Sequence, residues 1–384
     1  MTVIPGVQRR AECLLPPTLI TLAGLLGSVL GGPSVPSDGV DGVLVRLAIH
    51  RHQVGPLLHA ALRRCGPAVA EELMRDLATS HCRSARRHAS DFARLQRIGA
   101  MFAARGIVWM ALKGTLQAGQ LYGDPALRPS SDIDLLVAPG DFAGAVAALA
   151  VDGYIPSNPP VPAGLLRAPI LAAVRDVSLI AEDDHSCAVD LHRRLFLAAG
   201  ARPQRLRLTP GQGPLPTPRL DADLACYLIM HGAQSYWVRL KWLADLVPLL
   251  ARLDDAEKDA ISVRARQAGA GHSVAASLLL LRQLFPFTQL GPLAPWLEAQ
   301  QHRPAVNKRL ERYAQMIGMD RDWKRSPLDN ARVTMEAYFS LFESPWTRAG
   351  MVPVALLSSA VRRAAGAVWR ADRALTRGDA PPPG

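Results

Sequence analysis

The sequence predicts an α+β fold, in which a small mixed-sheet core is flanked by N- and C-terminal helical regions. Two observations predict this layout. Apolar residues recur at the spacing of one helix face over residues 14–30 and 40–104, which are joined by a Gly/Pro loop, and again from residue 221 onwards. Between these stretches the pattern changes to short apolar runs of strand length, bounded by glycine, proline and polar turns.

These changes of pattern divide the 384 residues into five segments. About half of the residues are apolar and only 20% are charged, so the chain can bury a sizeable core. The expected segments are a helical N-terminal region (1–104), an α/β core (105–200), a Pro-rich linker (201–220), a helical C-terminal region (221–378) and a disordered tail (379–384).

Within the core, each element follows from a local signal. The apolar run 107–112 predicts a strand, and a helix is expected at 115–122. Asp141 is expected to cap the helix 142–151. Residues 155–170 hold five prolines and are expected to form a loop. Further strands are predicted at 132–137, 177–181 and 187–191, the last two joined by a polar turn.

Asp132 and Asp134 carry the main chemical signal. On a strand, residues two apart point to the same face, so these carboxylates can share a divalent cation or hold two. Mg²⁺ suits such a site because it prefers oxygen ligands. Both residues alternate with apolar neighbours, and charge close to a core needs compensation. The alternative is a strand edge that faces water.

A second signal is the turn Lys113-Gly114-Thr115, where an apolar strand runs into a helix. Glycine lets backbone N–H groups approach an anion, and a helix N-terminus favours phosphate. Lys113 would add a cation and Thr115 a hydroxyl donor. Lys113 is one of only five lysines in an arginine-rich chain, which favours a functional role over an ordinary strand–helix turn.

Three further residues belong to this hypothesis. Asp190 lies on a later apolar strand and is expected to complete the metal site or to act as a general base. Arg128 and Ser131 lie on the polar loop that enters the Asp132 strand, where they are expected to contact a triphosphate. Each has a plainer interpretation, as a strand-end carboxylate or a surface side chain. His192 shares the face of Asp190 and is expected to be a structural partner.

These motifs together resemble a known family. L-K-G, L-Y-G-D-P, R-P-S-S-D-I-D-L-L-V and V-D-L-H are similar to the uncharacterised nucleotidyltransferase family within the DNA polymerase β-like superfamily. The resemblance implies that Gly114-Thr115 occupies the Gly-Ser position and that Asp132, Asp134 and Asp190 are the three acidic positions. The chain departs from the superfamily pattern in having Thr115 instead of serine and a longer stretch between Gly114 and Asp132.

The resemblance covers about 105–200 strongly and extends more loosely to the flanking helices, including His231 and the stretch 237–245. It implies a role near the nucleotide for Arg239, Lys241 and Asp245. From the residues alone, Lys241 and Asp245 are four apart on a helix and can equally form a surface ion pair.

The predicted function is therefore a Mg²⁺-dependent nucleotidyltransferase, with Mn²⁺ as the alternative metal. It would move an NMP group from ATP or another NTP to an unidentified acceptor, a small molecule, peptide or protein, and release pyrophosphate. Two alternatives stay open. The same metal site could serve a phosphotransferase, or the chain could be a non-catalytic nucleotide-binding scaffold.

Charge and cysteines give weaker indications. The net charge is +11, but more than half of the excess lies in residues 301–384, away from the motif, so nucleic acid is only a weak candidate partner. A basic stretch at 362–377 could equally lie on a membrane surface. The five scattered cysteines include no C-x-x-C pair, which fits a cytoplasmic protein, and no transmembrane segment is expected.

Overall fold

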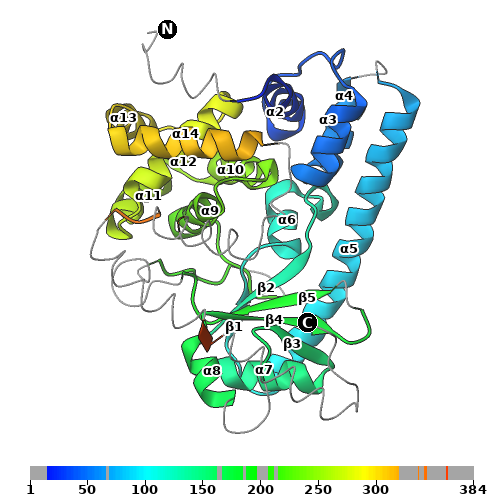
Figure 1. Ribbon diagram of the computed structural model, residues 1–384, viewed down its shortest axis with the longest axis vertical. Coiled ribbons are helices and arrows are strands. Elements are labelled where there is room, and N and C mark those ends of the chain that lie inside the picture. Colours follow the sequence, from blue (N-terminus) through cyan, green and yellow to red (C-terminus); the bar gives the residue numbers. More distant parts are fainter. Residues whose placement is uncertain are drawn as a thin grey trace, which may run out of the picture.

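The computed structural model describes residues 15–65, 69–161, 167–184, 187–196, 206–211 and 215–319, with 336, 341–343 and 360–361. It confirms the α+β class: a five-stranded mixed sheet lies at one end of the molecule and most of the helices at the other (Figure 1). The predicted tail 379–384 and most of the predicted helical stretch beyond residue 319 lie outside the described residues.

The N-terminal region is helical, as predicted, but broken. Its helices are α2 (Pro17–Leu30), α3 (Gly42–Arg46), which continues into a π-helical turn (Leu47–Arg51), α4 (Gly55–Cys65) and α5 (Glu71–Ala103). Within the helical stretch predicted at 40–104, one break lies at Gln53, whose φ of 54° is incompatible with a right-handed helix. The 33-residue α5 spans both halves of the molecule. Its Leu77 packs among helices, whereas its Phe102 packs on the sheet.

The sheet has the strand order β1-β2-β5-β4-β3, in which only β2 and β5 are parallel neighbours. The strands are β1 (Trp109–Ala111), β2 (Asp132–Val137), β3 (Tyr154–Asn158), β4 (Asp176–Ala181) and β5 (Ala188–His192). Four of the five were predicted, and β2 has the expected bounds.

The fifth strand corrects a prediction. Residues 155–170 were expected to form a loop, yet Tyr154–Asn158 pairs with β4 as β3, and Arg167–Ala173 forms the helix α8. Pro156 lacks a backbone N–H, which an edge strand tolerates because one of its sides has no neighbouring strand. The strand order places β3 at that edge.

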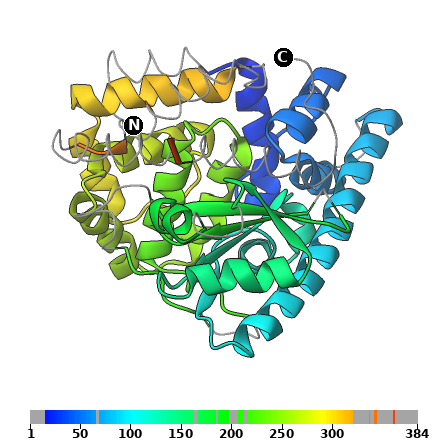
Figure 2. The same cartoon turned by 60° about the horizontal axis from the view of Figure 1, so that its bottom comes forward.

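The two faces of the sheet differ in chemistry because side chains alternate along each strand. Ile133, Leu135 and Val137 of β2 join a core with α7 (Phe142–Val151) and the end of α5. Figure 2 shows α7 against the sheet and α5 along its side. The opposite face carries Asp132 and Asp134 toward the helical half.

One predicted cap is not formed. Asp141 immediately precedes α7, but its carboxylate accepts a hydrogen bond from the backbone N–H of Val108 at 3.0 Å. The side chain therefore ties the start of α7 to the residue before β1. Long-range pairing has replaced the local capping bond that the sequence predicts.

The C-terminal helices complete the second half of the molecule. They are α9 (Ala222–Gln234), α10 (Leu240–Arg252), α11 (Asp255–Gln267), α12 (Gly271–Leu284), α13 (Leu293–Gln300) and α14 (Pro304–Gly318). They share one apolar core with α2 and α4, so N- and C-terminal helices pack together above the sheet (Figure 1). Among the described residues, no helix combines the length and apolar character that crossing a bilayer requires.

Candidate active site

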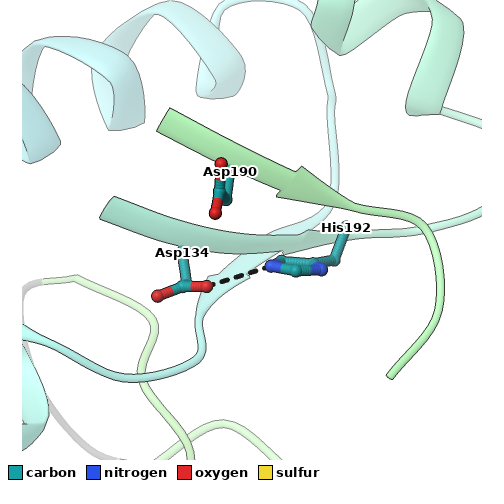
Figure 3. Close-up of side chains that lie close together, drawn as sticks. All are labelled: Asp134, Asp190 and His192. Carbon is teal, nitrogen blue, oxygen red and sulfur yellow. Dashed lines mark hydrogen bonds and ion pairs between the residues drawn. The ribbon is translucent and has the colours of Figure 1, made fainter. Parts of the chain in front are cut away.

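All three predicted carboxylates lie on the polar face of the sheet, but among the described residues only Asp134 and Asp190 approach within metal-ligand distance of each other, and Asp132 is not part of that group. Asp132 and Asp134 lie two residues apart on β2, and Asp190 on β5 is the direct register partner of Asp134. His192 follows on the same face of β5. Figure 3 shows Asp134 and Asp190 extending from neighbouring strands, with the His192 ring directed at Asp134.

Asp134 is the most deeply buried of these groups, at 2% exposure, and both of its oxygens are engaged. Lys113 Nζ lies 2.9 Å from Oδ2, and His192 Nε2 lies 3.0 Å from Oδ1. Burial opposes ionisation of Asp134, but Lys113 and His192 hold its pKa well below the usual range. Burial likewise opposes the charge on Lys113, yet Asp134 and Asp132 raise its pKa above the ordinary value.

The geometry and charge of this cluster fit a divalent cation. Ligand atoms of Asp134, Asp190 and His192 all lie within 4.8 Å of one another. Burial raises the pKa of Asp190; a hydrogen bond with Ser178 opposes this rise, and the carboxylates of Asp134 and Asp132 add to it. Neighbouring carboxylates that disfavour each other's charge are what a cation compensates. His192, expected as a structural partner, does bond to Asp134.

Gly114 forms the predicted turn between β1 and α6 (Thr115–Tyr122). Its φ of 89° and ψ of −134° belong to a region that only glycine enters readily. A Cβ there would lie 3.2 Å from Ser130 Oγ. The turn therefore needs glycine both for its backbone conformation and for its close approach to the loop before β2.

The hydroxyl of Thr115, predicted to contact phosphate, is already engaged. Thr115 is buried, and its Oγ1 lies 2.8 Å from His88 Nδ1 on α5. The other ring nitrogen of His88 lies 2.7 Å from the carbonyl oxygen of Arg128. His88 thus links the glycine turn to the loop that enters β2. The hydroxyl of Thr115 therefore has a structural role in this link.

Arg128 also lies in an unexpected contact. Its Nε donates to Asp245 Oδ2 at 2.8 Å, and Tyr122 donates its hydroxyl to Oδ1 of the same carboxylate at 2.8 Å. Arg128 and Asp245 are both buried. Lys241 donates to the carbonyl oxygen of Pro129 at 3.1 Å. The alternative of a Lys241–Asp245 ion pair on the helix surface is therefore wrong, because both side chains are buried and each binds the loop before β2.

A cleft of about 520 Å³ lies over the polar face. Asp132, Asp134, Lys113, Gly114, Arg128 and Ser131 line it, whereas Thr115 and Asp190 are not among its lining residues. The cleft walls are rich in cations and aromatic rings. The lining cations are Arg51, Lys113, Arg128, Arg175, Arg239 and Lys241.

The aromatic residues of the helical side of the cleft come from α9, α10 and the turn between them. The rings of Tyr227 and His231 lie 6.0 Å apart, and those of His231 and Trp242 lie 5.8 Å apart. Burial, and then the charge of Lys113, lowers the pKa of His231 well below its ordinary value. The wall therefore presents neutral, flat side chains beside the charged sheet face, and such faces can stack on planar ligands.

Several lining residues could not be found from sequence motifs. Arg51, Arg175 and Tyr227 lie in separate segments with no local pattern around them. Lys241 did carry a signal, because the scarcity of lysine that favoured a role for Lys113 applies to it equally.

Comparison with known proteins gives one match. A family model described as "Uncharacterised nucleotidyltransferase" matches residues 42–286. This range runs from the start of α3 to just beyond α12 and contains all the cleft-lining residues. No curated protein and no solved structure matches the chain.

Proposed function

The chain belongs to the uncharacterised nucleotidyltransferase family, and on this premise we propose that it transfers the NMP group of ATP or another NTP to an acceptor and releases pyrophosphate. One observation carries the proposal: Asp132, Asp134 and Asp190 lie on a single face of two adjacent strands, beneath a cleft lined by cations. We place this core in the DNA polymerase β-like superfamily on the same pattern of acidic positions.

The carboxylates of Asp132, Asp134 and Asp190 would hold Mg²⁺ or Mn²⁺. The bound cation would supply charge neutralisation for the phosphates and polarise the phosphorus under attack. His192 steadies Asp134 through its 3.0 Å contact. Lys113 lies on the other oxygen of Asp134, close to where a nucleotide phosphate would enter the cleft.

In the proposed reaction, an oxygen or other nucleophilic atom of the acceptor forms a bond to the α-phosphorus. The bond between the α- and β-phosphates breaks, and pyrophosphate leaves with its electron pair. Asp190 either completes the metal site or accepts the proton of the acceptor. Gly114 and Ser131 line the cleft where the phosphates would lie.

The first test is thermal stabilisation by NTPs in the presence of Mg²⁺ or Mn²⁺. A ligand that binds only the folded state raises its stability, so the acceptor need not be known. We expect a metal-dependent rise in melting temperature for the wild type and its loss in the Asp132→Asn/Asp134→Asn variant. No shift with any nucleotide would contradict the proposal.

The second test uses NTP labelled at either the α- or the γ-phosphate and follows where the label goes. Transfer of the α-phosphate label to an acceptor supports nucleotidyl transfer, whereas transfer of the γ-phosphate label identifies a phosphotransferase. Nucleotide binding without transfer of either label, across peptide, protein and small-molecule acceptors, favours a scaffold.

A further inference from the structure

The cations predicted to hold the triphosphate already have partners. Lys113 is paired with Asp134 at 2.9 Å, and Arg128 is paired with Asp245 at 2.8 Å. The Thr115 hydroxyl is bonded to His88. These side chains bring little uncompensated positive charge to the cleft, so a polyphosphate needs another source of charge.

That source lies on the opposite wall, where α10 begins. Arg239 immediately precedes α10 and Lys241 is its second residue, and both line the cleft with Asp132. Within the part of the chain that the structure describes, neither lies within 4.0 Å of a carboxylate oxygen. Lys241 has only the neutral carbonyl of Pro129 as its hydrogen-bond acceptor there.

The environment of Lys241 is unfavourable for its own charge. The residue is 6% exposed. Burial lowers its pKa to about 7; Arg128 and Arg239 also lower it, while Asp132 and Asp245 partly oppose the change. A buried ammonium beside two guanidinium groups is costly unless an anion compensates it. A ligand that carries several negative charges would supply that compensation.

Two neutral side chains on the same side of the cleft also have polar atoms without a hydrogen-bond partner among the described residues. Gln53 and Gln234 line the cleft, and the buried side-chain atoms in question are Gln53 Oε1 and Gln234 Nε2. The backbone of Gln53 lies in the left-handed region, as does that of Tyr236. Such conformations cost free energy and persist where the surroundings impose them, often at binding sites.

We propose that Arg239 and Lys241 form a subsite for the terminal phosphates of the nucleotide substrate, across the cleft from the carboxylates of the sheet. This inference rests on the proposed function and adds to it the position of the polyphosphate. The α-phosphate would lie over Asp132 and Asp134, and the β- and γ-phosphates would extend toward the start of α10.

The first experiment measures binding of inorganic tripolyphosphate by calorimetry in EDTA, without metal or nucleoside. Arg239→Gln and Lys241→Met are each expected to weaken binding roughly 10-fold or more, because each removes a charge-assisted hydrogen bond. The matched control is Arg252→Gln, which removes one charge from the exposed end of the same helix. We expect less than about a twofold change for it, as for a distant screened charge.

Equal weakening in Arg252→Gln and the two subsite variants would reveal general attraction to a basic protein and overturn the proposal. Unchanged binding in Arg239→Gln would overturn it as well. Arg239 is partly exposed, so this variant is expected to keep the fold even if Lys241→Met does not.

The second experiment identifies the source of the phosphate. With Mg²⁺ present, Arg239→Gln should weaken binding of ATP roughly 10-fold but change that of AMP less than about twofold, since AMP lacks the terminal phosphates. Loss of tripolyphosphate binding with unchanged ATP binding would assign the subsite to an anionic acceptor and overturn the proposal.

The two proposals fail separately. In EDTA the Asp132→Asn/Asp134→Asn variant should bind tripolyphosphate at least as tightly as the wild type, because it removes repulsion from the anion. If the carboxylates prove to have no catalytic role, the tripolyphosphate result still stands. If the subsite variants bind normally, the carboxylate proposal is unaffected.

Discussion

The two walls of the cleft differ in how their charges are compensated. On the sheet wall, the buried Asp134 has Lys113 and His192 as partners. On the helical wall, Arg239 and Lys241 have no carboxylate partner among the described residues, although Lys241 is buried. The sheet wall is thus built to keep charged groups in position, whereas the helical wall leaves charge to be met by a ligand. This difference singles out Arg239 and Lys241 as the cleft charges that a bound anion would compensate.

The largest expected effect is a loss of turnover, and it comes from the two aspartates of the sheet wall. Asp132→Asn and Asp134→Asn should each lower turnover at least about 10³-fold, or about 4 kcal/mol of transition-state stabilisation, if both hold the metal. Their effects on stability should differ. Asp134→Asn leaves the ammonium of Lys113 without its buried counter-ion and should cost about 3–5 kcal/mol.

Asp132 has no such ion pair among the described residues, so Asp132→Asn should change the free energy of unfolding by at most about 0.5 kcal/mol. Urea unfolding of both variants, alongside the transfer assay, measures the contrast. Equal stability losses would show that the two aspartates share one structural environment, and normal turnover in either would remove it from the metal site.

The next effect concerns the contact that joins the two walls. Arg128 from the loop before β2 and Asp245 from α10 form a buried ion pair. Arg128→Met or Asp245→Asn alone should cost about 3–5 kcal/mol, because each leaves the other charge buried and unpaired. The double variant should cost less than the sum, with a coupling of about 0.5–3 kcal/mol in a double-mutant cycle of urea unfolding.

Additive losses in that cycle would indicate that the pair is not formed in solution. Arg128 would then be available to the triphosphate, as the sequence predicts, and Arg128→Met would weaken ATP binding. The double-mutant cycle therefore distinguishes a structural ion pair between Arg128 and Asp245 from a role of Arg128 in binding the triphosphate.

The smallest effect tests the shape of the helical wall. A Cβ on Gly232 of α9 would lie 2.3–2.6 Å from ring atoms of Trp237, which lies in the turn between α9 and α10. Gly232→Ala should cost about 1–3 kcal/mol through overpacking. The control is Gly119→Ala in α6, where nothing lies within 4 Å of the added methyl group. Gly119→Ala should raise the free energy of unfolding by about 0.5–1 kcal/mol. Destabilisation of both variants would show that the loss in Gly232→Ala does not come from tight packing against Trp237.

Much of the site was predictable because it depends on local periodicity. Helix 115–122 and strand 132–137 have the predicted bounds, since turn residues and apolar runs mark their ends. The two-residue repeat of a strand is enough to place Asp132 and Asp134 on one face. The edge strand at Tyr154–Asn158 was missed because Pro156 and the prolines that follow the strand indicate a loop, and only its place at the end of the strand order makes Pro156 tolerable.

By itself, the sequence determined which side chains share a strand face and which turn requires glycine, because these properties depend on neighbours within a few residues. Tertiary structure decided which charges are paired. Arg128 meets Asp245 across 117 positions of the chain, and Lys241 meets the Pro129 carbonyl across 112. The counter-ion of a buried charge is chosen by packing between distant segments, and local sequence patterns do not record that choice.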